Sequence, residues 1–444
     1  MPDVVRFAPS PTGELHIGNV RTALYNWFLA ISSGGSFVLR YDDTDVERSK
    51  DSFAKQISID LDWLGIEPGR VERQSERLAR YDAAAEDLRR AGLLYPCYET
   101  PEELDRKRSR LRARGLPPVY DRAALSLSDA ERHALEAEGR RPHWRFKLPA
   151  GARSWDDLCR GPQTVNLGAV SDPILVREDG SYLYTLPSVV DDIDFTVTTV
   201  VRGEDHVTNS GVQIAIFEAL GASAPQFAHH NLLVRGDGEP LSKRDNPLSI
   251  RRLAQDGYEP LAVASLAVLV GTSHPVAPGE SLDQLAKTVA LKDVSRGPAT
   301  FDPAELKRLN AAIVHALPAP ATDPREALLW TTVRDNLTFR GDVNLWRERL
   351  EADADAISTA SPLSGDEKVI VSEALALLPP EPWDEATFGA WTKAVRQQTG
   401  AKGKALFMPL RKALTGADSG PELGPWMRLL GHEATVARLE AAAT

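Results

Sequence analysis

The sequence predicts an α/β fold in which one parallel sheet, split by an insertion, is followed by an all-α half. Strand and helix signals alternate over residues 1–95, and they return over residues 171–246. From residue 247 onward the apolar side chains recur almost wholly with the helical period. Since 444 residues are too many for one compact core, we expect about two to four domains.

The chain opens with a strand, a loop and a helix. The strand covers residues 4–8, and the loop after it contains two prolines and a glycine. Apolar side chains at helical spacing then follow at Val20, Ala23, Leu24, Trp27, Phe28 and Ile31. His16 and Gly18 therefore lie where the strand gives way to the helix. The free N–H groups and the positive dipole end of that helix suit a phosphate.

A second strand, residues 36–41, follows a Gly34-Gly35 break and ends in Asp42-Asp43-Thr44-Asp45. Two short strands joined by a helix form a right-handed parallel unit, and such sheets bind ligands beyond the carboxyl ends of their strands. The loop 10–19 and the acidic segment 42–45 both lie at that edge. No G-x-G-x-x-G dinucleotide fingerprint accompanies them.

Changes of pattern divide the rest of the chain. Residues 1–95 and 171–246 form the halves of the α/β domain, and residues 96–170, rich in Arg and Pro, form the insertion. The second half has strand signals at 173–177, 182–186, 195–201 and 231–234 and a helix at about 210–220. A buried helix near 261–269 and amphipathic segments near 303–317, 325–336, 365–378, 385–398, 403–415 and 424–442 follow. We divide this helical part into residues 247–315 and 316–444.

Composition is typical of a folded cytoplasmic protein. Hydrophobic residues make up 42% and charged residues 26%, with no apolar run long enough for a bilayer and no signal sequence. Cys97 and Cys159 form neither a disulfide framework nor a zinc ligand set. The net charge of −11 has the wrong overall sign for a nucleic-acid binder. A basic stretch at residues 106–114 opposes that sum, although alone it is more typical of a solvated helix face.

Two clusters of side chains could serve a nucleotide. His16 with Gly18 could donate to phosphate oxygens and let a nucleoside approach the backbone, or it could simply cap or pack the helix. The second cluster is the loop Gly238-Glu239-Pro240-Leu241-Ser242-Lys243-Arg244. Its adjacent cations could close over a triphosphate, or they could form an ordinary solvated loop tip.

Two further clusters could serve an acidic substrate. Arg6 and Arg202 each end a predicted strand, where an arginine suits bidentate capture of a carboxylate. Nearby carboxylates could bind an ammonium group or simply hold these arginines: Asp42, Asp43, Asp45, Glu204 and Asp205. In the segment 182–192, Tyr184, Asp191 and Asp192 would face the same crevice. Because no protein nucleophile or metal cluster accompanies these groups, they favour positioning and electrostatics, as in nucleotidyl transfer.

Together these motifs resemble those of class I aminoacyl-tRNA synthetases. Pro9-Ser10-Pro11-Thr12-Gly13 with His16-Ile17-Gly18-Asn19 resembles the first signature, usually ending His-Ile-Gly-His, and Leu241-Ser242-Lys243-Arg244 resembles the second, Lys-Met-Ser-Lys-Ser. The longer version beginning at Arg6 is similar to the glutamyl and glutaminyl enzymes. Segments that resemble the bacterial glutamyl branch are 43–45, 73–77, 190–192 and 407–416. The resemblance covers nearly the whole chain and is weakest between residues 320 and 400.

The resemblance implies a Rossmann-like catalytic domain that makes glutamyl-tRNA in two steps. The α-carboxylate of L-glutamate attacks the α-phosphorus of ATP, assisted by Mg²⁺, and the terminal adenosine of tRNA(Glu) then takes the glutamyl group on its 2′-hydroxyl. The residues implied for ATP are His16, Gly18, Asn19, Ser242, Lys243 and Arg244, of which His16, Gly18 and Lys243 would be catalytic. Those implied for glutamate are Arg6, Ala8, Ser10, Asp42, Tyr184 and Arg202.

The resemblance also implies how a tRNA would meet the chain. The insertion would contact the acceptor end, residues 247–315 the stem, and residues 316–444 the anticodon. The family is typically monomeric and works without a membrane. Two sets of tRNA partners are compatible with the sequence, tRNA(Glu) alone or tRNA(Glu) with tRNA(Gln), because the anticodon-reading part resembles its relatives least.

Several positions depart from the family pattern. Asn19 replaces the second signature histidine, and Pro240 replaces the first lysine of the second signature. Asp42 stands where many relatives carry Glu, and Ser188 where many carry Asn, so both could reshape the amino-acid pocket. Of the zinc-ligating cysteines that some relatives carry in the insertion, only Cys97 remains, and we expect no structural zinc.

Three other functions fit the sequence less well. A tRNA-modifying paralogue would lack the long helical half, and the small nucleotidyltransferases with a similar His-x-Gly-His motif are single short domains. A catalytically inactive RNA-binding protein is the alternative from a different class. The intact His16, Gly18 and Lys243 count against it.

Overall fold

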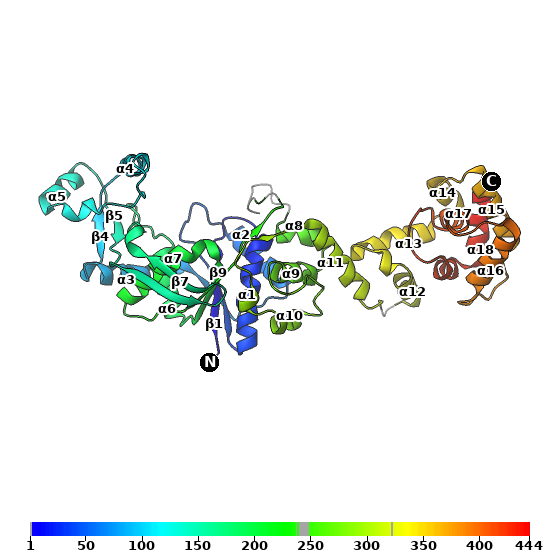
Figure 1. Cartoon of the computed structure of the whole chain (residues 1–444), viewed down its shortest axis with the longest axis horizontal. Coiled ribbons are helices and arrows are strands. Elements are labelled where there is room, and N and C mark those ends of the chain that lie inside the picture. The colour runs from blue at the N-terminus through cyan, green and yellow to red at the C-terminus, as the bar shows by residue number, and fades with distance from the viewer. Residues whose placement is uncertain (1, 237, 239–247, 321–322) are drawn as a thin grey trace. The chain divides into compact units, whose positions relative to one another are not determined.

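The computed structural model describes residues 2–236, 238, 248–320 and 323–444 (Figure 1). The chain divides into two compact units. Unit 1 is made of Met1–Asp256 and Pro260–Pro303, and unit 2 of Gly257–Glu259 and Ala304–Thr444. Unit 1 is α/β and unit 2 is helical, as the sequence predicts.

Parallel strands form the centre of unit 1. They are β1 (Val4–Phe7), β2 (Ser36–Tyr41), β3 (Arg70–Arg73), β9 (Thr199–Gly203) and β10 (Gln226–His230). β2 pairs with both β1 and β3, and β9 pairs with β10, in each case parallel. β9 lies beside β1, where the Thr198 amide donates to the Val4 carbonyl over 2.9 Å. Strands from before and after the insertion are thereby brought together.

Helix α1 (Ile17–Ser33) connects β1 to β2. Val20, Leu24 and Phe28 are buried on it, as the apolar spacing predicts. Ile31, expected on the same face, is 41% exposed, because it lies in the last turn before the helix ends. Gly34, with φ of 64°, adopts the left-handed conformation that ends the helix without steric cost.

Seven further helices are described in unit 1 outside the insertion. They are α2 (Asp51–Trp63), α3 (Leu78–Arg90), α6 (Thr185–Asp194), α7 (Val207–Ala219), α8 (Ile250–Gln255), α9 (Pro260–Leu269) and α10 (Leu282–Thr288). Helix α9 is buried from Ala262 to Leu269 and packs against α1, which confirms the predicted buried helix. The short strands β11 (Leu233–Val234) and β12 (Ala299–Thr300) pair in parallel.

The insertion adds an antiparallel sheet, a hairpin and two helices. In the sheet, β5 (His143–Phe146) pairs with β4 (Leu94–Cys97), which begins just before residue 96, and with β8 (Ile174–Val176), which follows residue 170. The hairpin is formed by β6 (Ala152–Asp157) and β7 (Gly161–Asn166). The helices are α4 (Pro101–Ala113) and α5 (Asp129–Ala137). The hairpin packs against β10, where the Leu158 amide donates to the Phe227 carbonyl over 2.9 Å. Residues of the hairpin thus lie beside the central strands.

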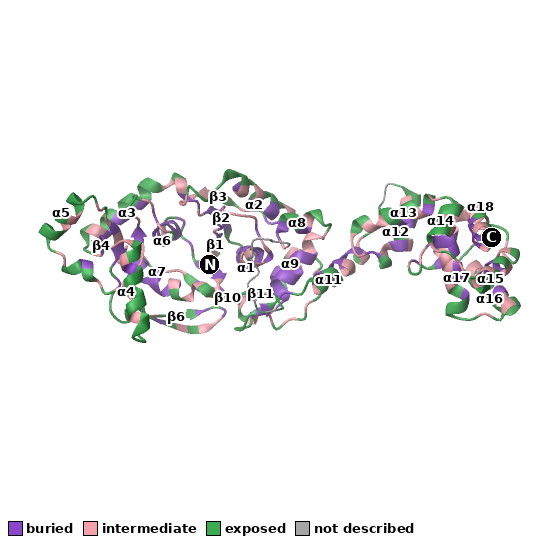
Figure 2. Cartoon of the chain, turned by 90° about the horizontal axis from the view of Figure 1, so that it is seen from above, coloured by how far each residue is buried: buried purple, intermediate pink, exposed green. Residues whose placement is uncertain are grey.

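Unit 2 is built from helices. They are α11 (Pro303–Ala316), α12 (Pro324–Val333), α13 (Val343–Glu351), α14 (Ala354–Ala360), α15 (Gly365–Ala376), α16 (Thr387–Thr399), α17 (Lys404–Thr415) and α18 (Leu423–Ala443). Figure 2 shows buried residues within this set of helices. Trp391 and Trp426 lie in its core, and their indole N–H groups donate to the carbonyls of Ala374 and Leu414. The buried indoles are thereby hydrogen-bonded as well as packed.

Some predicted elements are wrong. Residues 182–186 do not form a strand, because α6 begins at Thr185, with Pro187 in its first turn, where proline is tolerated. The strand predicted from 195 begins only at Thr199, since Thr196 has a positive φ of 54° that extended backbone does not have. Strand β10 and helices α13 and α14 were not predicted. None of the described helices is both long and apolar enough to cross a membrane.

Candidate active site

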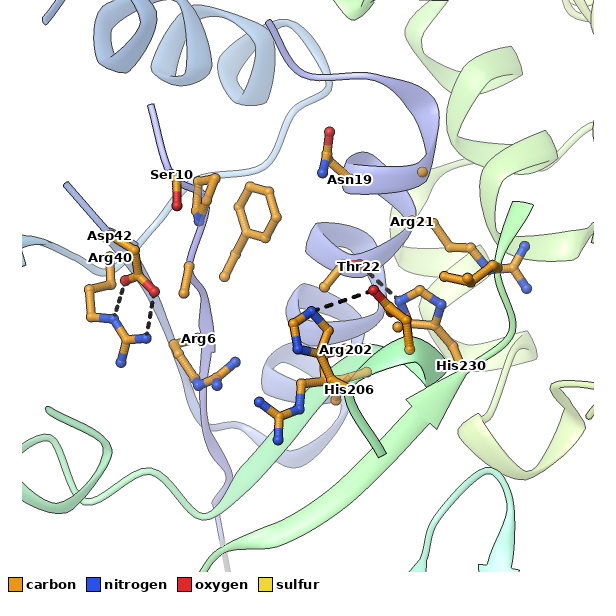
Figure 3. Close-up of a pocket in the computed structure, with 18 of the residues that line it drawn as sticks. Arg6, Ser10, Asn19, Arg21, Thr22, Arg40, Asp42, Arg202, His206 and His230 are labelled. Atoms are coloured by element: carbon orange, nitrogen blue, oxygen red, sulfur yellow. Dashed lines mark hydrogen bonds and ion pairs between the residues drawn. The ribbon is translucent and has the colours of Figure 1, made fainter. Parts of the chain in front are cut away.

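A pocket of about 550 Å³ opens where β1, β2 and β9 end (Figure 3). Its lining includes every described residue that the resemblance implies for ATP or glutamate: Arg6, Ala8, Ser10, His16, Gly18, Asn19, Asp42, Tyr184 and Arg202. Strand ends of a parallel sheet meet at one edge, which is why segments so far apart in sequence share one cavity. Pro240, Ser242, Lys243 and Arg244 lie outside the described residues.

His16 caps helix α1. Its Nδ1 accepts the amide hydrogens of Gly18 (3.1 Å) and Asn19 (3.3 Å), and the Asn19 side chain accepts the His16 amide hydrogen (3.2 Å). The predicted free N–H groups at this helix end are therefore wrong for Gly18 and Asn19, because the imidazole occupies both. The capping alternative for His16 is confirmed.

Capping also fixes the chemical form of the ring. Burial lowers the pKa of His16, which favours the neutral imidazole at neutral pH. With Nδ1 acting as an acceptor, the proton of the neutral ring is on Nε2. His16 can therefore both cap the helix and offer one N–H donor. A β-carbon on Gly18 would lie 3.0 Å from two atoms of the imidazole, so this position favours glycine.

Arg202 is a buried cation without an ion pair. Its Nη2 donates to Ser210 Oγ and to Gln213 Oε1, both at 2.6 Å, and both acceptors are uncharged. Its Nε has no hydrogen-bond partner, and no described carboxylate pairs with the guanidinium. Burial, and then the charge of Arg6, lower the pKa of Arg202 to about 10. An anion in the pocket would relieve both effects.

Arg6 belongs to a network of buried ion pairs. Its Nε donates to Asp192 Oδ1 (3.1 Å), and the same oxygen accepts from Arg40 Nη1 (2.9 Å). Arg40 also holds Asp42 in a bidentate pair, with Nε–Oδ1 at 2.7 Å and Nη2–Oδ2 at 3.2 Å. Ser188 accepts from the same Nη2 over 3.3 Å. Figure 3 shows Arg40 and Asp42 together at one side of the pocket, with Arg6 nearby.

This network decides which charges remain available to a ligand. Burial raises the pKa of Asp42 and Arg40 opposes that rise. Burial alone would lower the pKa of Arg40, but Asp42 and Asp192 raise it overall. The guanidinium of Arg40 is thus committed to the protein, whereas that of Arg202 is not.

Tyr184 is 40% exposed and lines the pocket, so it is not a core residue. It packs edge-on against the imidazole of His206, with ring centroids 6.4 Å apart. The prediction that Asp191 and Asp192 share its crevice is wrong, because both are buried in ion pairs behind the pocket. Asp191 accepts from Arg77 (2.8 Å), Gln74 (2.9 Å) and Tyr81.

The other carboxylates that were expected near the arginines have partners other than Arg6 and Arg202. Asp43 accepts the amide and hydroxyl of Ser75 (2.8 and 2.9 Å), and Glu204 pairs with Arg160. Asp45 accepts the Arg48 amide (3.3 Å), and Asp205 lies 3.7 Å from His206 Nε2. Of the five carboxylates, only Asp42 and Asp205 line this pocket.

Sequence reasoning missed several lining residues, among them Arg40, His206 and His230. A charged side chain between the apolar residues of the second strand was a signal for Arg40, since a buried arginine requires partners. His230 was missed because it is the last residue of β10, a strand that was not predicted. Its Nε2 lies 2.8 Å from Thr22 Oγ1, and burial and the charge of Arg21 lower its pKa to about 3.

The basic stretch lies along the second half of α4, in the insertion, and on its C-cap residue Arg114. Arg106, Arg108, Arg110, Arg112 and Arg114 are exposed, whereas Lys107 pairs with Glu99 and Asp121, both at 3.2 Å. A groove of about 270 Å³ beside this helix has a lining that includes Lys107, Arg108, Arg110 and Arg114 together with Leu111, Val119 and Tyr120. Positive charge over an apolar floor suits a polyanion with flat bases.

Comparison with known proteins agrees with this geometry. Residues 4–308 match the family described as tRNA synthetases class I (E and Q), catalytic domain, and residues 343–443 match an anticodon binding domain. Glutamate–tRNA ligase 1 of Brucella ovis and glutamate–tRNA ligase 2 of Brucella melitensis are each 55% identical to the chain, over 98% of it and 99% of their own length.

Solved structures are similar over the full length. A glutamate tRNA ligase from Elizabethkingia meningosepticum, in complex with its amino acid, is 27% identical with a TM-score of 0.83, covering 100% of this chain and 99% of that one. Glutamate-tRNA synthetase from Elizabethkingia anophelis is 25% identical with a TM-score of 0.81, covering 100% of both chains.

Proposed function

The chain belongs to the class I tRNA synthetases for glutamate and glutamine, and we propose that it is a glutamate–tRNA ligase. Arg202 is the observation that carries the choice of glutamate. A buried guanidinium with no ion pair among the described residues favours an anionic ligand. The side-chain carboxylate of glutamate meets that need, and the neutral carboxamide of glutamine does not.

In the first step, an oxygen of the glutamate α-carboxylate attacks the α-phosphorus of ATP. An O–P bond forms as the bond to the pyrophosphate oxygen breaks, and pyrophosphate leaves. His16, through Nε2–H, with Gly18 and Asn19 would contact ATP on one side. Ser242, Lys243 and Arg244, outside the described residues, would supply positive charge on the other. Arg6, Ala8, Ser10, Asp42, Tyr184 and Arg202 would frame the glutamate.

In the second step, the 2′-hydroxyl of the terminal adenosine attacks the activated carbonyl, and AMP leaves. The exposed cations of α4 support contact of the insertion, residues 96–170, with the acceptor end. Residues 247–315 would follow the stem, and residues 316–444 would read the anticodon of tRNA(Glu). We further propose that the enzyme acts in the cytoplasm as a monomer.

Mg²⁺ would enter with ATP. Groups of three or more His, Cys, Asp or Glu side chains able to hold a metal are absent from the described residues, and Asp42 is already held by Arg40. Such a site fits a magnesium ion that is bound through phosphate oxygens and water rather than by a protein cage. Bound there, the ion would neutralise phosphate charge.

We propose that the insertion folds without zinc, because its only cysteine in the expected place has other partners. The Tyr120 hydroxyl lies 3.6 Å from Cys97 Sγ and donates to Glu99 over 2.9 Å, and Glu99 pairs with Lys107. Burial raises the pKa of the Cys97 thiol to about 11, which disfavours the thiolate that zinc requires. Metal analysis of purified protein should find zinc well below one equivalent, and stoichiometric zinc would contradict the proposal.

The direct test is a charging assay with purified tRNA(Glu) and tRNA(Gln), each offered glutamate and glutamine. We expect glutamate on tRNA(Glu). Glutamate also on tRNA(Gln) would identify an enzyme that does not discriminate between the two tRNAs. Binding of tRNA without any charging would favour the inactive RNA-binding alternative and refute the proposed activity.

Lys243→Ala should lower the rate of adenylate formation by about two to three orders of magnitude, because it removes a charge that stabilises the transition state. The affinity for tRNA should stay within about twofold. Pre-steady-state adenylate formation and a tRNA-binding titration measure the two quantities. Lys55→Ala, an exposed lysine of α2, is the matched control. Equal adenylation rates for the two variants would be inconsistent with the role of Lys243.

A further inference from the structure

Arg202 stands at the end of a buried hydrogen-bonded chain that the two-step reaction does not use. Asp157 Oδ2 lies 2.5 Å from His229 Nδ1, and His229 Nε2 lies 2.8 Å from Ser210 Oγ. Ser210 Oγ in turn accepts from Arg202 Nη2 over 2.6 Å. The side chains of Asp157 and His229 are 0% exposed, as is Ser210.

The direction of each hydrogen bond follows from chemistry. A carboxylate only accepts, so Nδ1 of His229 carries the hydrogen that faces Asp157. Burial lowers the pKa of His229, so the ring is neutral and Nε2 is an acceptor. The Ser210 hydroxyl then donates to Nε2, and its lone pairs remain for the Arg202 guanidinium.

The side chains of this hydrogen-bonded series are fixed by contacts with a neighbouring strand, with aromatic rings and with backbone amides. His229 is the register partner of Arg202 on the neighbouring strand. Its ring stacks on Phe227 (centroids 6.1 Å apart, 16° between planes) and packs against Trp155. Asp157, from the hairpin of the insertion, also accepts the amide hydrogens of Cys159, Arg160 and His229 on Oδ1. Neither group can turn away without losing several contacts.

The order of charges is the informative feature. A carboxylate in direct contact with Arg202 would neutralise it and compete with an acidic substrate. Here the carboxylate of Asp157 is two uncharged groups away, so it orients the Arg202 guanidinium without pairing with it. The guanidinium keeps its charge for a ligand while its direction is fixed by Ser210 and Gln213.

We propose that Asp157, His229 and Ser210 are positioning residues that aim Arg202 at the side-chain carboxylate of the amino acid, and so contribute to selecting glutamate over glutamine. This inference rests on the proposed function. A positioning role differs from a packing role in one respect. Loss of the hydrogen bonds between Asp157 and Arg202 weakens recognition of the side-chain carboxylate and leaves the ATP side of the pocket unchanged.

Ser210→Ala and His229→Asn test two separate links. Asparagine can keep the donor to Asp157 but not the acceptor for Ser210. In each variant, KM for glutamate should rise by about tenfold, with KM for ATP and kcat within about twofold. The preference for glutamate over glutamine in kcat/KM should fall by a similar factor. Ser265→Ala is the matched control, since Ser265 is equally buried, accepts one amide hydrogen and does not contact Arg202.

A double-mutant cycle separates positioning from packing. In the Arg202→Gln background, Ser210→Ala should cause no further rise in the dissociation constant of glutamate, because the group that Ser210 orients is gone. Additive effects, or equal rises in KM for ATP and glutamate, would overturn the inference while leaving the proposed function intact. A wild-type protein that neither binds nor transfers glutamate would overturn both.

Discussion

Arg202→Gln is expected to lower kcat/KM for glutamate by about three orders of magnitude or more. The wild-type pocket offers a buried, unpaired guanidinium, and burial and Arg6 lower its pKa to about 10 while leaving it charged at neutral pH. A carboxylate ligand therefore gains a charge-assisted contact with a guanidinium that no described carboxylate occupies. With glutamine at position 202 the ligand carboxylate would be buried opposite a neutral amide. Steady-state kinetics with glutamate varied at saturating ATP and tRNA measure the loss.

The matched variant is Arg202→Lys. Lysine restores the charge but not the planar fork that donates to Ser210 and Gln213 at once. We expect it to recover part of the affinity for glutamate and little of the preference over glutamine. KM for ATP should be unchanged in both variants. If Arg202→Gln leaves KM for glutamate within twofold of wild type, then Arg202 does not bind the side-chain carboxylate.

The convergence of the site could be predicted because it depends on topology. Residues after β1, β2 and β9 must meet at one edge of parallel strands, and a short sequence pattern identifies each strand. Arg6, Asp42 and Arg202 all followed from this rule. The resemblance to a known family added roles to positions that topology had already grouped.

Partnerships across long distances could not be predicted. The acidic residues near the arginines are alike in sequence, yet Asp42 and Asp192 pair with Arg40 and Asp205 does not. Which carboxylate reaches which guanidinium depends on side-chain directions set by packing. The link from Asp157 to Arg202 is of the same kind, since it joins the insertion hairpin to β10 and α7.

Local signals failed where two patterns overlap. The apolar run 182–186 fits a strand, but Pro187 lies in the first turn of α6, and the chain becomes helical from Thr185. His16 shows the reverse case. Its position at a helix start supported both capping and phosphate contact, and the geometry allows both because the two ring nitrogens are separate groups.

Arg40→Met is expected to destabilise the protein by about 3–5 kcal/mol. Arg40 is 1% exposed, forms a bidentate pair with Asp42, and donates to Asp192. Its Nε also lies 3.6 Å from Asp191, so the Arg40 guanidinium contacts three carboxylates, of which Asp191 and Asp192 each have a second arginine partner. Methionine fills much of the volume but leaves these charges buried with fewer partners. Urea denaturation followed by circular dichroism should show that unit 1 of the variant unfolds at a lower urea concentration than unit 1 of the wild type.

Arg70→Met is the control, because Arg70 pairs with Glu72 at the surface, with the arginine side chain 47% exposed. Its loss should cost less than about 1 kcal/mol.

The effect of Arg40→Met should also depend on pH in a defined direction. Without Arg40 the folded-state pKa of Asp42 should lie further above its unfolded value, because burial raises this pKa and Arg40 opposes that rise. Between the two pKa values the unfolded variant then binds fewer protons than the folded one, so its stability falls as pH rises from the unfolded pKa, near 4, to the raised folded-state pKa. The difference in the free energy of unfolding between wild type and Arg40→Met should therefore be largest at neutral pH and become smaller toward pH 4. A difference that grew in acid would contradict this account of Arg40.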